Sequence, residues 1–157
     1  MKKIFLTVAA VALLAACNNE REYLDYRGLS MKMKPKDFAD SLAKRGFAVD
    51  SAASGEDQVV MRSQKEHYSV TIASEKDTIL VVQEDYTATY NDSTRNLFQT
   101  LRDEYAKSLS VTPYIPDRGD DHKTAVFQTS KGTVTIILEN TYTPTLSVKF
   151  DRHIVGK

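Results

Sequence analysis

The sequence predicts an α+β protein in which helices pack on one face of an antiparallel sheet. Two amphipathic helical stretches, 35–45 and 93–108, each precede three stretches that alternate apolar and polar residues. Such alternation is typical of antiparallel strands with one buried and one solvated face. The order of a helix and then three strands occurs twice, which suggests two pseudo-repeats, 28–90 and 91–157, within one domain, 28–157.

Residues 35–45 carry the signals of a short helix. Pro35 suits a first helical turn, because the N–H that it lacks would have no partner there. Phe38 and Leu42 are four residues apart and share one face. Gly46 can adopt the left-handed conformation that ends many helices. We therefore expect this helix to end just before Gly46.

Three strands are expected after this helix. The first covers 57–63 and contains three consecutive apolar residues, and the second, 68–73, alternates cleanly. The polar segment 74–77 supplies a turn. The third strand, 78–86, is the most apolar of the three, which suggests a central position in the sheet.

The second half repeats this plan. A helix over 93–108 carries a stripe of large residues at helical spacing, and the polar segment 116–123 is expected to be an exposed loop. Strands over 124–130 and 133–139 then form a hairpin, and a strand over 146–151 closes the chain. The helical stripe consists of Leu97, Phe98, Leu101 and Tyr105.

A short sequence echo supports an internal duplication. The segment 60–65, Val-Met-Arg-Ser-Gln-Lys, is echoed by 126–131, Val-Phe-Gln-Thr-Ser-Lys. Each segment overlaps the first predicted strand of its half of the chain, although a similar order of elements can also arise without duplication.

The N-terminus has the order of a secretory signal peptide. Lys2 and Lys3 precede an apolar run, 4–13, which is too short to span a bilayer, and small residues then lead to Cys17. The segment 14–17, Leu-Ala-Ala-Cys, resembles the lipobox of bacterial lipoproteins. This resemblance implies that residues 1–16 are cleaved off and that Cys17 is acylated. The alternative is an ordinary cleaved signal with a cysteine nearby by chance.

Acylation at Cys17 would hold the protein on a membrane. Each buried methylene contributes about 0.8 kcal/mol, so that two or more acyl chains anchor a protein stably. Residues 17–27 are mostly polar and are expected to be a tether. Because Asn18, and not aspartate, follows the cysteine, we expect the outer membrane, with the domain on its periplasmic or surface face.

Composition excludes several functions. Loss of Lys2 and Lys3 leaves 19 basic residues against 21 acidic ones, so nucleic acid is an unsuitable partner. Cys17 is the only cysteine, and its lipidation leaves no thiol for catalysis, a disulfide or a zinc site. There is also no Gly-rich phosphate loop, nucleophile elbow or His-Glu-x-x-His motif. We therefore expect no cofactor and no metal.

Three stretches resemble a group of small, mostly uncharacterised lipoproteins of Bacteroides and relatives. Gly28-Leu29-Ser30, with the helix that ends in Gly46-Phe47, resembles the opening of that group. Residues 125–134 resemble its Lys-Gly-Thr hairpin, and 146–151 its closing strand. The segment 110–113 departs from the group, which has a Tyr-Gly-Pro-like exit there. The resemblance implies no catalytic residues. The predicted architecture also resembles the tandem helix-plus-sheet repeats of beta-lactamase inhibitor proteins, a likeness of fold alone.

Two polar features of the sequence are candidate sites. The segment 117–122 is rich in aspartate, but it lacks the alternating ligand spacing of a calcium loop, so we expect a solvated loop. The chain has eight tyrosines and no tryptophan, and four tyrosines lie near predicted turns, where they could form a binding surface for a glycan or protein. These candidate binding residues are Tyr86, Tyr90, Tyr114 and Tyr142.

The sequence thus favours a non-enzymatic binding or interaction module of the cell envelope. One alternative is a hydrolase whose site forms only in the fold, for example from carboxylates with His122 or His153. Another is an inhibitor or immunity protein. The segments that begin at Asp50, Asp77 and Asp92 also resemble the O-glycosylation pattern of Bacteroides proteins.

Overall fold

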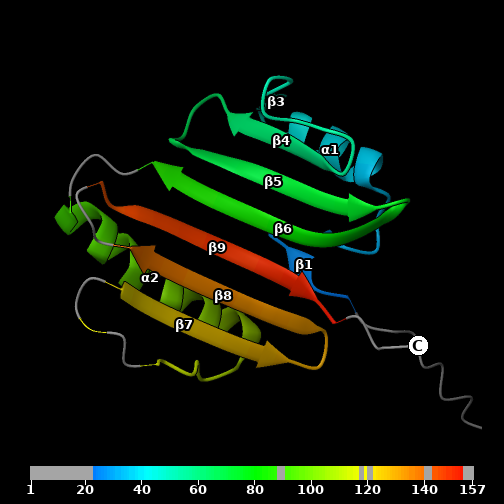
Figure 1. Cartoon of the computed structure of the whole chain (residues 1–157). Helices are drawn as coiled ribbons and strands as arrows, with labels where there is room; N and C mark the ends of the chain where they lie inside the picture. The colour runs from blue at the N-terminus through cyan, green and yellow to red at the C-terminus, as the bar shows by residue number, and fades with distance from the viewer. Residues whose placement is uncertain (1–22, 88–90, 117–118, 120–121, 140–142, 154–157) are drawn as a thin grey trace, which may run out of the picture.

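The computed structural model describes residues 23–87, 91–116, 119, 122–139 and 143–153 (Figure 1). Two helices and nine strands follow one another in this part of the chain. In order they are β1 (Asp25–Tyr26), β2 (Leu29–Ser30), α1 (Pro35–Ala43), β3 (Phe47–Val49), β4 (Gln58–Ser63), β5 (Tyr68–Glu75), β6 (Thr78–Thr87), α2 (Asn91–Leu109), β7 (His122–Thr129), β8 (Gly132–Glu139) and β9 (Thr145–Arg152).

Seven strands form one antiparallel sheet in the order β3-β4-β5-β6-β9-β8-β7. The two halves of the chain therefore join where β6 pairs with β9, at the centre of the sheet (Figure 1). The predicted α+β class with an antiparallel sheet is confirmed. Strand β3 was not predicted, because its three residues are too few to show an alternating pattern.

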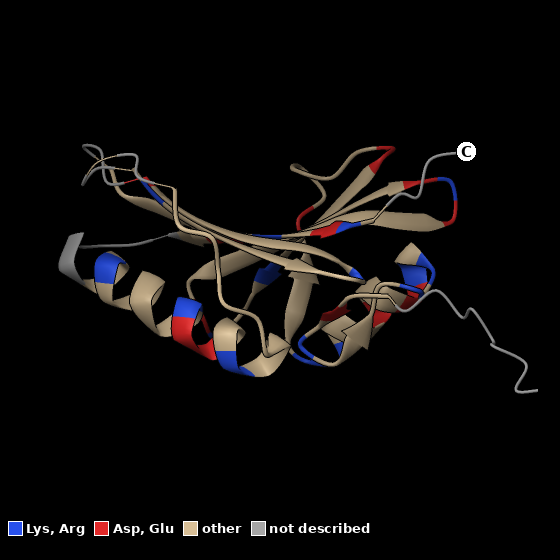
Figure 2. Cartoon of the chain, turned by 90° about the horizontal axis from the view of Figure 1, so that it is seen from below, with Lys and Arg blue, Asp and Glu red and all other residues tan. Residues whose placement is uncertain are grey.

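Both helices pack on the same face of the sheet (Figure 2). Helix α1 contacts β3, β4 and β5, and α2 contacts β7, β8 and β9. As the spacing predicted, Phe38 and Leu42 of α1 and Phe98 and Leu101 of α2 are buried. Full burial of each such side chain contributes about 1.5–3 kcal/mol. Gly46, which follows α1, has φ of 92° and so supplies the expected left-handed stop.

A small hairpin of β1 and β2 lies between the part of the core under α1 and the part under α2. Tyr26 reaches both halves of the core, because its ring centroid lies 6.0 Å from that of Phe38 in α1 and 5.3 Å from that of Phe150 in β9. Through Tyr26 the hairpin packs on the central strands β6 and β9. Each helix packs mainly on strands nearer the edges of the sheet.

The fold begins upstream of the predicted boundary at residue 28. Leu24 and Tyr26, which we assigned to the tether 17–27, are only 2% and 1% exposed. The polar residues around them hid a strand of two residues, whose register pairs Asp25 with Ser30. The tether prediction is therefore wrong for residues 24–27, while residues 17–22 lie outside the described part of the chain.

The other face of the sheet is covered by neither helix (Figure 2). One cross-strand row on it contains Thr71, Gln83, Lys149 and Thr135. This polar row agrees with the alternation on which the prediction of a one-sided sheet rested. Within the described residues, no helix is long and apolar enough to cross a membrane.

Candidate functional site

A carboxylate lies in the middle of the apolar core. Glu84 is on the helix-covered face of β6 and is 0% exposed. Its neighbours across the sheet are Val70 of β5 and Val148 of β9, both fully buried. A charge in such surroundings is costly unless it is paired and hydrogen-bonded.

Three side chains satisfy this carboxylate. The Tyr26 hydroxyl donates to Oε1 over 2.7 Å, and Arg27 Nε donates to the same oxygen over 2.5 Å. The Tyr86 hydroxyl donates to Oε2 over 2.7 Å. Arg27 Nη2 in turn donates to the Tyr86 oxygen over 2.9 Å. We call these four residues, Tyr26, Arg27, Glu84 and Tyr86, the Glu84 cluster.

Arg27 is held at the tip of the β1–β2 hairpin. Because Tyr26 pairs with Leu29, Arg27 and Gly28 form a turn of two residues, and their φ angles are 46° and 78°. Turns of this kind require positive φ at both positions and favour asparagine or glycine. An arginine in this conformation costs about 1–2 kcal/mol. Backbone strain of this kind is common at functional sites.

Aromatic rings complete the setting of this guanidinium. Arg27 Cζ lies 5.6 Å from the centroid of the Tyr68 ring, and Tyr68 stacks on Tyr86 with centroids 5.0 Å apart. The Arg27 side chain nevertheless remains 43% exposed. The site thus presents an oriented cation whose counter-charge is buried beneath it.

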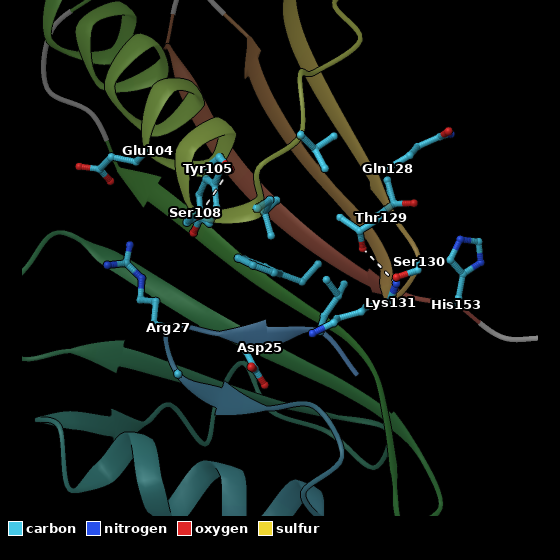
Figure 3. A pocket seen from close by; sticks show the side chains of 16 residues that line it. Asp25, Arg27, Glu104, Tyr105, Ser108, Gln128, Thr129, Ser130, Lys131 and His153 are labelled. Atoms are coloured by element: carbon cyan, nitrogen blue, oxygen red, sulfur yellow. Dashed lines mark hydrogen bonds between the residues drawn. The ribbon is translucent and has the colours of Figure 1, made fainter. Parts of the chain in front are cut away.

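A cavity of about 980 Å³ opens beside Arg27. It lies between the β1–β2 hairpin, the end of α2 and the β7–β8 turn (Figure 3). Its volume is at the upper end of the range for small-molecule sites. Five large side chains form its apolar wall, namely Leu24, Tyr105, Leu109, Val111 and Phe150. The charged and titratable side chains around it, besides Arg27, are Asp25, Glu104, Lys131 and His153.

A smaller hollow of about 170 Å³ lies on the other side of Arg27. Arg45, Lys65 and Tyr68 are among its lining residues. Arg45 Nη1 donates to the backbone carbonyl of Arg27 over 2.9 Å. This bond helps to fix the hairpin tip between the two hollows.

Burial and the carboxylate keep the cluster tyrosines protonated. Burial, reinforced by the charge of Glu84 and its hydrogen bonds, raises the pKa of Tyr26 and of Tyr86 well above the usual value. Burial also raises the pKa of Tyr105 above its usual value. For Arg27 burial acts to lower the pKa, but the hydrogen bond to Glu84 and its charge outweigh it and raise the pKa. The hydroxyls are therefore neutral donors and Arg27 is a permanent cation.

The structure separates the tyrosines that the sequence grouped. Tyr86 belongs to the Glu84 cluster, whereas Tyr114 bridges Val126 beyond the edge of β7 and is 69% exposed. Strands β9, β8 and β7 lie between them, which at about 4.8 Å per strand places them well apart. Tyr90, Tyr142 and Cys17 lie outside the described residues.

Sequence reasoning missed Arg27 and Glu84. Glu84 had a detectable signal, because strict alternation places it on the same side of its strand as Val82 and Tyr86. Arg27 had none, since it precedes Glu84 by 57 residues. His153 lines the large cavity, while His122 lies at the start of β7. No group of three potential metal ligands occurs within the described residues.

Comparison with family models finds none that matches this chain, and comparisons with curated proteins and with solved structures find no match either.

Proposed function

We propose that this chain is a lipid-anchored protein of the cell envelope that binds a ligand in the large cavity without transforming it. The observation that carries the proposal is Arg27, which is fixed by a buried carboxylate and lines a cavity of about 980 Å³ that has one apolar wall. An oriented guanidinium recognises carboxylates and phosphates through paired N–H donors. Its bonds to Glu84 and Tyr86 use only part of that donor capacity.

The ligand therefore combines an anionic group with an apolar body. Five aromatic and aliphatic side chains form one wall of the cavity, and polar or charged side chains form most of the remaining lining, so that both parts of such a ligand find partners. A glycan or an envelope protein with an exposed carboxylate would engage the same cation.

An anionic fluorescent probe tests the binding site. We expect anilinonaphthalene sulfonate, which joins a sulfonate to aromatic rings, to bind the folded full chain with enhanced fluorescence. The double variant Arg27→Gln/Glu84→Gln removes the cation without leaving an unpaired buried carboxylate, and it should weaken binding at least tenfold. The exposed Lys107 of α2 does not line the cavity, so that Lys107→Gln is the matched control. Equal binding by all three proteins would refute the proposed site.

The anchor is tested separately at Cys17. We expect mass spectrometry of the native product to find diacylglyceryl and N-acyl groups on Cys17 and to find residues 1–16 removed. Cys17→Ser should abolish acylation and release the protein from outer-membrane fractions. A bare thiol on membrane-bound protein would contradict the anchor and leave the cavity proposal intact.

One observation favours a second candidate function. His153 lines the large cavity together with the carboxyl-bearing residues Asp25 and Glu104, and this residue set could serve general acid–base hydrolysis. Screening the full chain against ester and glycoside substrates, with His153→Gln as comparison, tests it. Turnover that depends on His153 would replace the binding proposal with a hydrolase.

We also infer that the two halves are pseudo-repeats. The echo aligns Met61 of β4 with Phe127 of β7. Met61 pairs with Val70 and Val70 with Glu84, just as Phe127 pairs with Val134 and Val134 with Phe150, so that β5 aligns with β8 and β6 with β9. The row that contains Met61, Val70 and Glu84 thereby matches the row that contains Phe127, Val134 and Phe150. Glu84 thus occupies a position that the second half fills with phenylalanine, which supports a role for its charge other than packing.

A further inference from the structure

The large cavity lies where the described chain enters and leaves the fold. Leu24 and Asp25, from its beginning, and His153, from its end, all line the cavity. Arg152 Cζ lies 4.5 Å from the centroid of the Tyr23 ring, so that the two ends touch. Figure 1 shows β1 beside the end of β9 on one side of the sheet.

This placement sets the distance of the cavity from the membrane, given the lipid anchor proposed above. Five residues lie between Cys17 and Tyr23, so that six Cα–Cα steps join the two. At about 3.3–3.6 Å per residue, even a fully extended chain spans only about 20 Å between them. The cavity is therefore held close to the lipid surface, whichever way the domain turns.

The lining suits a molecule with one apolar chain and one anionic end. Leu109, Val111 and Phe150 belong to its apolar wall, and Arg27 lies at one end of the cavity (Figure 3). Burying an acyl chain is favourable in proportion to the number of methylene groups removed from water. A carboxylate or phosphate on Arg27 would meet a donor group that Glu84 already holds in position.

We propose that the cavity takes an anionic lipid with a single acyl chain, whose head group lies on Arg27 and whose chain lies along the apolar wall. This inference rests on the proposed ligand site and names its ligand. Fatty acids and lysophospholipids share the required chemistry, and the experiment below separates these two sources.

Displacement of anilinonaphthalene sulfonate measures the specificity. The protein is the full chain with Cys17→Ser, so that its own acyl chains do not compete. We expect laurate to displace the probe at least tenfold more effectively than dodecanol, which has the same chain length and no charge. Acetate should not displace the probe at the concentrations where laurate does. Lauroyl lysophosphatidylglycerol represents the membrane source, and whichever of the two lipids acts at lower concentration identifies the source.

Two variants place the lipid. Val111→Glu introduces a carboxylate into the apolar wall and should weaken laurate binding at least tenfold. Arg27→Gln/Glu84→Gln should lower laurate to the affinity of dodecanol and leave dodecanol itself unchanged. Lys107→Gln should change neither. Circular dichroism confirms that each variant is folded before its binding is compared.

The outcomes separate this inference from the proposed function. If the probe binds in an Arg27-dependent way but laurate and its lysophospholipid fail to displace it, the lipid inference is wrong and the anion-binding cavity stands. If laurate binds no better than dodecanol, the assignment of the head group to Arg27 is wrong. If Val111→Glu leaves laurate binding unchanged, the assignment of the acyl chain to the apolar wall is wrong. If the probe itself does not bind, both proposals fail.

Discussion

Replacing Arg27 by glutamine tests whether the Glu84 carboxylate is a buried charge that needs a partner. Glu84 is 0% exposed and Arg27 is its cationic partner at 2.5 Å. Removing one partner of a buried ion pair costs about 3–5 kcal/mol. We expect a value near 3 kcal/mol, because the Tyr26 and Tyr86 hydroxyls still donate over 2.7 Å and because the Arg27 side chain is 43% exposed.

A double-mutant cycle measures this loss. Glu84→Gln should cost less, about 1–2 kcal/mol, because the half-exposed Arg27 can turn towards water. Arg27→Gln/Glu84→Gln should cost less than the sum of the single changes, with a coupling energy of about 1–3 kcal/mol. Urea unfolding followed by circular dichroism gives each value. If Arg27→Gln lowers the free energy of unfolding by less than about 1 kcal/mol, with an unchanged slope against urea concentration, then the buried Glu84 carboxylate does not need its cationic partner and the prediction is wrong.

Two further predictions concern the frame of the site. Gly132→Ala should lower the free energy of unfolding in urea by about 1–3 kcal/mol, because the added Cβ would meet the Asp151 carbonyl and lie 2.5 Å from Leu24 Cδ1. Gly55→Ala is the control, since its Cβ would have nothing within 4 Å, and it should change the free energy of unfolding by less than about 0.5 kcal/mol. Equal losses in the two variants would contradict the steric argument. The raised pKa of Tyr26 means that the fold favours its protonated form. Stability should be unaffected by this group below about pH 10, the pKa of a free tyrosine, and should fall as the pH rises further. The share of the tyrosinate absorbance that belongs to Tyr26 should appear only as the protein unfolds, and ionisation of every tyrosine in the folded protein would contradict this.

The sequence was informative where an element is long enough to show its period. Helix α1 carries Pro35 at its start and Gly46 just beyond its end, and β8 alternates over eight residues. The pairing of β6 with β9 could not be read from these patterns, because alternation fixes the face of a strand but not its neighbour. Strands β1 and β3 have two and three residues, which is too short for any period.

The candidate site depends on those short elements. Arg27 acquires its position from a turn between two strands of two residues each, and its partner is 57 residues away. Tyr86 was predicted as a binding residue for its place near a turn, yet its hydroxyl holds the carboxylate. Local pattern thus identified one member of the Glu84 cluster, and only the packed sheet brought the others to it.

The pseudo-repeat alignment suggests a test that separates stability from binding. If the second half fills the corresponding position with Phe150, an apolar side chain can replace Glu84 in packing, and replacing a whole buried ion pair by apolar groups is often neutral or stabilising. Tyr26→Phe must accompany Glu84→Met and Arg27→Gln, because the buried Tyr26 hydroxyl would otherwise lose its acceptor. We expect this triple variant to unfold within about 1 kcal/mol of the unmodified protein and to bind anilinonaphthalene sulfonate at least tenfold more weakly. A triple variant that is several kcal/mol less stable would mean that the ion pair is needed to build the fold, and the inference of a binding role from its charge would lose its basis.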